Sequence, residues 1–406
     1  MLHPRRIPFI GNGTFVEAKG EPSSINPPVF LMPKLLFFVT EDWWFCQHFL
    51  PMARAAQAAG FEVTVATRVH EHADRIAAEG CRVIALAQDR RSVDPGEVTS
   101  VVARMIRILR KERPDIVHCV GLRCVVLGGL AARLAGAGAL VLAPTGLGHL
   151  WVENGVIERI LRRIVRAFVG RWLRSSRTRY LFENSEDPRE FGLDPVGSDV
   201  TLVRGAGVDP KQFVVAPEPS TPPVKVAVVS RMLKPKGIAE AVAATCRARA
   251  HGALIELHLF GAPDPSNRTS YTEADLRAWS TEPCIHWHGS TRDVARVYRE
   301  HHIAMLLSYR EGLPRALVEA SAAGRPIIAT DVTGCREIVR DGREGLLVPP
   351  RDIEATAQAL STLAADAHLR ARMGAAAHAR FQKHFTEDAI KATMIELYKV
   401  LIGLRM

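Results

Sequence analysis

Residues 303–350 read IAMLLSYREGLPRALVEASAAGRPIIATDVTGCREIVRDGREGLLVPP, and this stretch decides the fold. The short apolar run at residues 303–307 predicts a strand buried on both faces, as in a parallel sheet. Pro314 is expected at the first position of the following helix, RALVEASAA, where no backbone amide hydrogen is needed. The sequence therefore predicts a strand, a loop and a helix in succession, the repeating unit of an open α/β sheet.

Two acids, Glu311 and Glu319, stand at this junction. Glu311 is expected in the loop at the carboxyl end of the strand. Glu319 falls in the second turn of the helix, opposite Leu317, whose face would pack on the sheet. Both carboxylates can then point into the crevice where open α/β sheets bind ligands. The alternative is an ordinary loop acid beside a solvated helix face.

The sequence around the two acids resembles the donor-site signature of retaining, GT-B-fold glycosyltransferases of family 4. In that family a loop with the pattern EG-x-P opens an E-x7-E motif, and a fixed series of small residues and acids follows. The matching residues here are Glu311, Gly312, Leu313, Pro314, Glu319, Gly324, Pro326, Ala329, Thr330, Asp331, Gly334, Glu337, Gly342 and 345–349. The resemblance implies that Glu311 approaches the transferred sugar, that the backbone amides of Gly312 and Leu313 meet sugar and phosphate, and that Glu319 accepts ribose hydroxyls.

Cations for a nucleotide diphosphate precede this stretch. The β-branched run VKVAVVS at residues 224–230 is followed by Arg231, Lys234, Lys236 and an alanine-rich helix. Two cations and a helix amino terminus can hold the negative charge of a leaving diphosphate without a metal ion. The resemblance assigns that role to Arg231 and Lys236, and it implies no cofactor and a metal-independent reaction. Basic residues on a solvated loop are the alternative.

Length and composition fit a two-domain α/β enzyme. The 406 residues are 47% hydrophobic, enough for two cores of ordinary size. Strand-like runs alternate with helical patterns from residue 34 onward, and the alternation restarts at residue 224. Five prolines between residues 210 and 223 predict an extended connector. The seven cysteines form no CxxC or zinc pattern, which indicates reduced thiols.

We therefore expect the GT-B architecture, in which two doubly wound, Rossmann-like domains face a cleft. The first 33 residues lack periodicity and predict a disordered tail. Residues 34–215 would form the acceptor-binding domain and residues 216–385 the nucleotide-sugar-binding domain. Residues 386–406 would form the helix that, in the GT-B fold, returns to the first domain.

Within the family, the amino-terminal half is most similar to bacterial transferases that extend undecaprenyl-diphosphate-linked saccharides. The residues that carry this similarity are 91–95, Arg123 and 145–148. Arg123 follows a strand, so it could bind the diphosphate of the acceptor. Capping of the following helix, or pairing with an acid, is the alternative.

Two departures from the family pattern concern the same half. Residues 40–44 read TEDWW where many members carry a glycine pair that lets the backbone approach the donor phosphate. Members often have VHxH at the end of the fourth strand, but residues 117–120 read VHCV, so only His118 is kept. His149 in an acceptor-binding role, or Glu41, could replace the missing histidine at position 120, and both could equally be structural.

Residues 156–180 hold eight arginines against one acid. An apolar stripe recurs in them at helical spacing; it comprises Ile157, Ile160, Leu161, Ile164, Phe168 and Trp172. A basic amphipathic helix can lie on anionic lipid, at about 1 kcal/mol per nearby arginine. A packing helix with solvated arginines is the alternative. Nucleic acid ranks last as a partner, because RNA-binding motifs and interleaved aromatics are absent from the sequence.

Together these features predict a cytoplasmic enzyme, peripheral on the inner face of a bacterial cell membrane. It would transfer a hexose or N-acetylhexosamine from a nucleotide diphosphate sugar, with UDP expected, to a polyprenyl-diphosphate-linked saccharide in surface polysaccharide or glycan biosynthesis. Two alternatives remain open at this point: a GT-B-fold sugar-nucleotide epimerase, or a catalytically silent module that binds nucleotide sugar or lipid.

Overall fold

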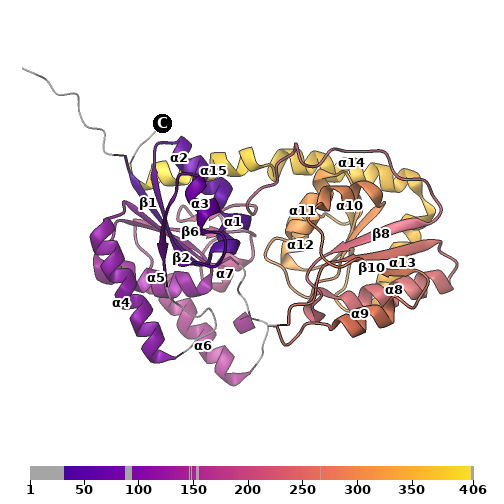
Figure 1. Cartoon of the computed structure of the whole chain (residues 1–406), viewed down its shortest axis with the longest axis horizontal. Coiled ribbons are helices and arrows are strands. Elements are labelled where there is room, and N and C mark those ends of the chain that lie inside the picture. The colour runs from indigo at the N-terminus through magenta and orange to yellow at the C-terminus, as the bar shows by residue number, and fades with distance from the viewer. Residues whose placement is uncertain are drawn as a thin grey trace, which may run out of the picture. The chain divides into compact units, whose positions relative to one another are not determined.

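Two parallel β-sheets organise the chain (Figure 1). The computed structural model describes residues 32–86, 94–145, 147, 149–151, 155–265 and 267–403. The predicted tail, except for Met32 and Pro33, lies outside these residues. The described helices long enough to span a bilayer all lack the apolar character that a span needs.

The first sheet has seven strands in the order β3-β2-β1-β4-β5-β6-β7. The strands are β1 (Lys34–Glu41), β2 (Glu62–Arg68), β3 (Arg82–Ala85), β4 (Ile116–Val120), β5 (Ala139–Ala143), β6 (Thr178–Phe182) and β7 (Val200–Leu202). The helices of this part are α1 (Asp42–His48), α2 (Leu50–Ala58), α3 (Ala73–Ala78), α4 (Pro95–Glu112), α5 (Leu122–Ala135), α6 (Val156–Ala167) and α7 (Asp187–Glu190), with short η1 (His149–Trp151) and η2 (Phe168–Trp172). Every residue of β4 and β5 is buried, because a hydrophobic cluster covers each face of the sheet.

The second sheet has six strands in the order β10-β9-β8-β11-β12-β13. The strands are β8 (Val224–Val229), β9 (Ile255–Phe260), β10 (Ile285–Trp287), β11 (Ile303–Leu306), β12 (Ile327–Thr330) and β13 (Gly345–Val348). The helices are η3 (Lys234–Lys236), α8 (Ile238–Ala250), α9 (Glu273–Trp279), α10 (Val294–Glu300), α11 (Arg315–Ala322), α12 (Thr333–Ile338), α13 (Ile353–Ala365) and α14 (Ala367–His384). The predicted fold class, with two Rossmann-like parallel sheets, is confirmed.

Each sheet has one point where the strand order reverses. In the first sheet β1 lies between β2 and β4, and in the second β8 lies between β9 and β11. The chain leaves these neighbouring strands toward opposite faces, so a crevice opens beside their carboxyl ends, where ligands bind in this kind of sheet. The predicted donor residues follow β8 and β11, the two strands at the second reversal point.

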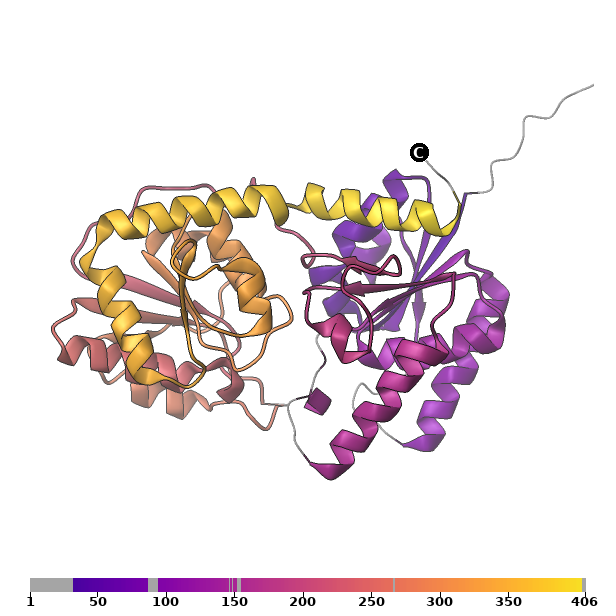
Figure 2. The same cartoon turned by 180° about the vertical axis from the view of Figure 1, so that it is seen from behind.

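The last helix, α15 (Glu387–Leu401), packs on the first sheet. Its buried residues Ile390, Met394 and Tyr398 belong to a cluster with strand β1 and helix α2. Figure 2 shows α15 and the preceding α14 in yellow. No helix or strand is assigned between residues 209 and 223, all of which are described.

Local details differ from the sequence prediction at one proline. Pro314 is the residue before helix α11, with an extended backbone, and the helix begins at Arg315. The difference follows from the clash between a proline ring and a helical conformation in the turn before it, which places the proline at the boundary. All seven cysteines are free, and six are buried.

Candidate active site

An ion pair between Lys236 and Glu311 lies at the carboxyl edge of the second sheet. Lys236 ends η3, which follows β8, and Glu311 lies in the loop after β11. A side chain on Gly237 would collide with the carbonyl oxygen of Leu307, because its Cβ would stand only 2.2 Å away. Glycine at this position therefore lets the first loop pack directly on the end of β11 and brings the lysine to the acid.

Glu319 lies in α11 with 11% of its side chain exposed. Arg315, one turn earlier, donates from Nε to Glu319 Oε1 at 2.7 Å. The same arginine donates from Nη1 to the carbonyl oxygen of Gln47 in α1 at 2.8 Å. Burial raises the pKa of Glu319 despite the neighbouring guanidinium. The alternative of a solvated helix face is therefore wrong for this acid.

The loop between the two acids is held from both sides. The amide of Asn184, after β6, donates to the carbonyl oxygen of Gly312 at 3.2 Å. On the other side Gly334 donates its backbone N–H to the carbonyl of Glu311 at 3.2 Å. Leu313 is partly buried against the second domain's core. The backbone amides of Gly312 and Leu313, which the family resemblance assigns to sugar and phosphate, thus belong to a fixed loop.

Arg231, the second predicted cation, pairs with Asp264 instead of with Glu311 or Glu319. Its Nη1 lies 3.7 Å from the carboxylate, and 62% of its side chain is exposed. The structure thus brings Lys236 and Glu311 into contact and holds Glu319 on the next helix. Arg231 stands on the same β8 loop as Lys236 but with a different partner.

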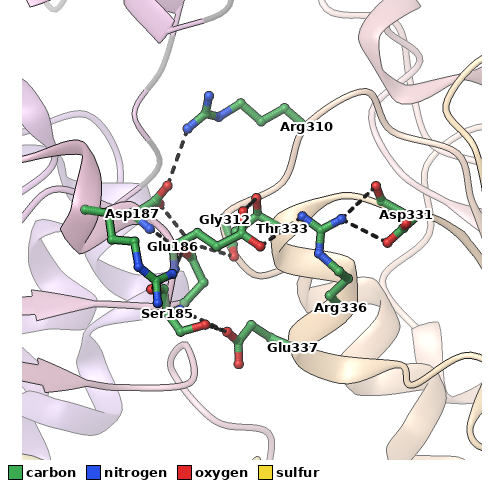
Figure 3. A network of polar contacts seen from close by, with 11 residues as sticks. Ser185, Glu186, Asp187, Arg310, Gly312, Asp331, Thr333, Arg336 and Glu337 are labelled. Carbon is green, nitrogen blue, oxygen red and sulfur yellow. Dashed lines mark hydrogen bonds and ion pairs between the residues drawn. The ribbon is translucent and has the colours of Figure 1, made fainter. Parts of the chain in front are cut away.

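A polar network joins the segment after β6 to the donor-site loops (Figure 3). Ser185 donates from its backbone N–H and from its hydroxyl to Glu337, at 2.9 and 2.8 Å. Glu186 accepts from Thr333 at 2.7 Å and from Arg336 at 2.9 Å. These contacts were not predicted. The signal for them is the polar run NSED at residues 184–187, directly after an apolar strand.

Glu183 is a further carboxyl group that sequence reasoning missed. It directly follows β6 and lines a small pocket with His48, Thr145 and Gly205. Burial, with the nearby charges of Asp187 and Glu311, raises the pKa of Glu183 to about 8. The group is therefore protonated at neutral pH and can donate a hydrogen bond.

The two predicted acceptor residues, Arg123 and His149, both belong to the first domain. Arg123 lies in the first turn of α5 and is half-buried, with its Nε and one Nη shielded from solvent. His149 begins η1, but its side chain lies outside what the structure describes, as do residues 91–93, Gly146 and Gly148.

Two residues near the missing family histidine have structural partners. His118 is fully buried, and its Nδ1 lies 2.8 Å from the hydroxyl of Tyr398 in α15. Burial lowers the pKa of His118 to about 3, so it is neutral. Glu41, at the end of β1, is buried, and its Oε2 lies 2.8 Å from Nε2 of His70.

The two Rossmann-like sheets, with a lysine, two glutamates and a fixed backbone loop at the reversal point of the second, define a glycosyltransferase of GT-B fold. Two family profiles match the chain. The one described as "Glycosyl transferases group 1" matches residues 223–366, and "Glycosyl transferase 4-like" matches residues 34–168. The chain belongs to the GT-B glycosyltransferases of family 4.

Three known proteins illustrate the similarity. The N,N'-diacetylbacillosaminyl-diphospho-undecaprenol alpha-1,3-N-acetylgalactosaminyltransferase of Campylobacter jejuni is 22% identical over 372 residues, 87% of this chain and 96% of that protein. Sucrose-phosphate synthase from Thermosynechococcus elongatus matches in structure with a TM-score of 0.74 at 19% identity, over 92% of this chain and 100% of the other. HepE from Anabaena, solved with UDP and glucose, matches with a TM-score of 0.71 at 16% identity, over 90% and 99%.

Proposed function

We propose that the protein is a retaining glycosyltransferase that moves a hexose or N-acetylhexosamine from a UDP-sugar to a polyprenyl-diphosphate-linked saccharide in polysaccharide or glycan biosynthesis. The observation that carries the proposal is the Lys236–Glu311 ion pair at the strand reversal of the second sheet. The HepE structure with UDP and glucose and the lipid-linked substrate named for the Campylobacter relative support the choice of donor and acceptor classes.

The ion pair suits transfer without a metal ion. When a donor enters, Lys236 can exchange the carboxylate of Glu311 for the β-phosphate, and Glu311 becomes available to the sugar. The exposed guanidinium of Arg231 on the same loop can turn to the diphosphate. The bond from the anomeric carbon to the β-phosphate oxygen breaks. The acceptor hydroxyl attacks from the same face, and its proton passes to the phosphate oxygen that leaves. Charge stabilisation and positioning would supply most of the rate.

Helix α6 supports a membrane-bound acceptor. No residue of this helix, which is described in full, is buried. Four residues of the apolar stripe lie in this helix and are open to solvent, with exposed fractions from 45% at Leu161 to 69% at Ile157, whereas Phe168, just after the helix, packs on the core of the first sheet. Arg159 and Arg163 are also exposed, whereas Arg166 pairs with Glu190. An apolar stripe beside exposed basic groups complements an anionic lipid surface, where a polyprenyl acceptor resides. We place the enzyme on the cytoplasmic face of the membrane.

The decisive experiment for the reaction is a panel of nucleotide sugars against bacterial lipid-linked acceptors, with the anomeric configuration of the product read by NMR. We expect transfer from a UDP-sugar with retained configuration. A changed sugar nucleotide without acceptor would identify an epimerase. Donor binding without any turnover would identify a silent binding module, and an inverted product would contradict the retaining mechanism.

Membrane binding is tested by co-sedimentation with phosphatidylglycerol vesicles. The variant R159E/R163E changes the charge by four units and leaves both the apolar stripe and the Arg166–Glu190 pair intact. The matched control R372E/K383E makes the same change on exposed positions of α14. We expect a steep loss of binding for the α6 variant only, and a loss for the wild type at 1 M salt, where the Debye length falls to about 3 Å.

Equal loss in the α6 variant and the control would mean that net charge, and not α6, drives vesicle binding. A wild type that ignores anionic vesicles would refute the membrane assignment. Turnover of a short-chain, water-soluble acceptor separates membrane binding from the reaction itself, because this turnover should survive in R159E/R163E.

A further inference from the structure

A cluster of imidazoles occupies one face of the second sheet at its edge. Strand β9 alternates, with Ile255, Leu257 and Leu259 buried on one face. Glu256 and His258 therefore share the other face. In the edge strand β10, His286 is the register partner of His258. The strand pairing thus places a carboxylate and two imidazoles side by side, in the middle of strands and not in the loops that form the donor site.

Three side chains of this cluster offer ligand atoms at close range. Oε2 of Glu256 lies 3.5 Å from Nε2 of His258 and 3.9 Å from Nε2 of His286. One ligand atom from each residue falls within 4.8 Å of the others. In a tetrahedral zinc site, bonds of about 2.0–2.1 Å separate neighbouring ligand atoms by roughly 3.3 Å. The three groups therefore need only small side-chain rotations to bind one ion.

His258 is already oriented as a metal-binding histidine would be. Its Nδ1 lies 2.9 Å from Nε2 of His288. Its Nε2 is buried, makes no hydrogen bond, and faces the carboxylate of Glu256. If Nδ1 carries the proton and donates to His288, Nε2 presents a bare lone pair toward a negative oxygen. A cation between them removes that repulsion. A metal-ligating histidine usually donates its other ring N–H to an acceptor in this way.

We propose that Glu256, His258 and His286 bind a single divalent transition-metal ion of the zinc type, with His288 orienting His258. Two imidazoles and a carboxylate are a donor set that suits Zn²⁺ and Co²⁺ over Mg²⁺ or Ca²⁺. Because two ligands come from β9 and one from β10, the ion fastens the three-residue edge strand to the sheet. This structural site is independent of the proposed glycosyl transfer.

The test is titration of the untagged, reduced protein with Co²⁺, followed by its visible absorption, and with Zn²⁺ in competition. We expect one equivalent per chain and d–d bands of a tetrahedral ion without the near-ultraviolet bands of thiolate ligation, because the described cysteines lie outside the cluster. The variants E256Q and H286A each remove one ligand and should weaken binding at least tenfold. H288F, which removes only the acceptor for His258, should weaken it by about ten- to 100-fold. H368A, an exposed histidine of α14, is the matched control and should bind like the wild type.

A second readout is thermal unfolding, which detects the ion without any enzymatic assay. Zn²⁺ should raise the Tm of the wild type and of H368A, since a ligand that binds only the folded state stabilises it. The Tm of H286A without metal, compared with that of the metal-free wild type, shows whether this variant folds. A wild type without stoichiometric binding would overturn the proposal, and so would wild-type affinity for the metal in E256Q and H286A.

Discussion

The carboxyl edges of the two sheets handle charge in different ways. The second sheet holds its charges in pairs, Lys236 with Glu311 and Arg315 with Glu319. In the first sheet Glu41 at the end of β1 is also paired, with His70, but burial keeps two other groups neutral at pH 7, His118 in β4 and Glu183 after β6. A paired edge can exchange one partner for a phosphate, whereas buried neutral groups offer hydrogen bonds without a charge. The difference fits the proposal that the second domain binds a diphosphate and the first positions an acceptor hydroxyl.

The largest effect on activity is expected from removing the cations of the paired edge. Lys236→Ala should weaken UDP binding and turnover by about 1.5–3 kcal/mol, roughly ten- to 150-fold, because a charge-assisted phosphate contact is lost. Arg231→Ala should fall at the lower end of that range, since its side chain is largely exposed. Isothermal titration measures the affinity of each variant for UDP, and steady-state kinetics measure its turnover. Unchanged UDP affinity in both variants would remove these residues from the donor site and with them the contrast between the two edges.

Glu319 tests the second pair of the same edge. Glu319→Ala should raise the KM for the donor about tenfold with little change in kcat, because ribose hydrogen bonds are present in both ground and transition states. Arg315→Ala is the control, since it removes the partner of Glu319 but leaves the carboxylate. An unchanged donor KM in Glu319→Ala would mean that this acid serves only to hold Arg315 in its contact with Gln47 of α1.

The neutral state of Glu183 is tested by the pH dependence of stability. The pKa of Glu183 is about 8 in the folded protein against an ordinary value of 4.5. Between these values the unfolded chain has released a proton that the folded chain retains, so this group's contribution to stability is present below pH 4.5 and is lost as pH rises toward 8. Glu183→Gln stays neutral and should escape the loss. Relative to the wild type, we expect it to gain up to about 3.5 kcal/mol in the free energy of unfolding between pH 5 and pH 8, since each pH unit over which the two states differ by one proton contributes about 1.4 kcal/mol.

Urea unfolding at the two pH values measures this gain. Glu186→Gln is a suitable control, because burial, which raises the pKa of Glu186, is outweighed by its bonds to Thr333 and Arg336, so the pKa is lowered and the opposite trend applies. If Glu183→Gln tracked the wild type at both pH values, Glu183 would be an ordinary ionised acid and burial would not hold it neutral.

Much of the fold follows from local sequence. The apolar runs around residues 35, 140 and 303 lie in strands of the structure, because strands covered on both faces need continuous apolar sequence. The start of α11 was predicted one residue early, since a proline can occupy either side of a helix boundary. The close contact of Lys236 with Glu311 depends on two strands that are neighbours only in the folded sheet.

Other features of the site could not be predicted for the same reason. Glu183 holds its proton because burial and two acids distant in sequence surround it. The bond from Asn184 to Gly312 joins residues 128 positions apart. His258 and His286 meet through the register of β9 and β10. Exposure of the α6 stripe also depends on what the rest of the chain leaves uncovered, so periodicity alone could not separate a packing helix from a membrane-binding one.

The smallest expected effect is that of removing metal ions. If the cations of the paired edge neutralise the leaving diphosphate, glycosyl transfer should persist in EDTA, with the initial rate within about twofold of the untreated enzyme. The imidazole cluster on β9 and β10 makes the control important, because a chelator would also strip an ion from it and lower the Tm. The variant E256Q separates the two effects. Loss of activity in EDTA that only Mg²⁺ or Mn²⁺ restores, in the wild type and in E256Q alike, would show that the donor diphosphate needs a metal and that Lys236 and Arg231 do not suffice. If Zn²⁺ restored the lost activity, and only in the wild type, the loss would be due to the metal site at edge strand β10. The donor site at the carboxyl edge of the second sheet would then work without a metal ion.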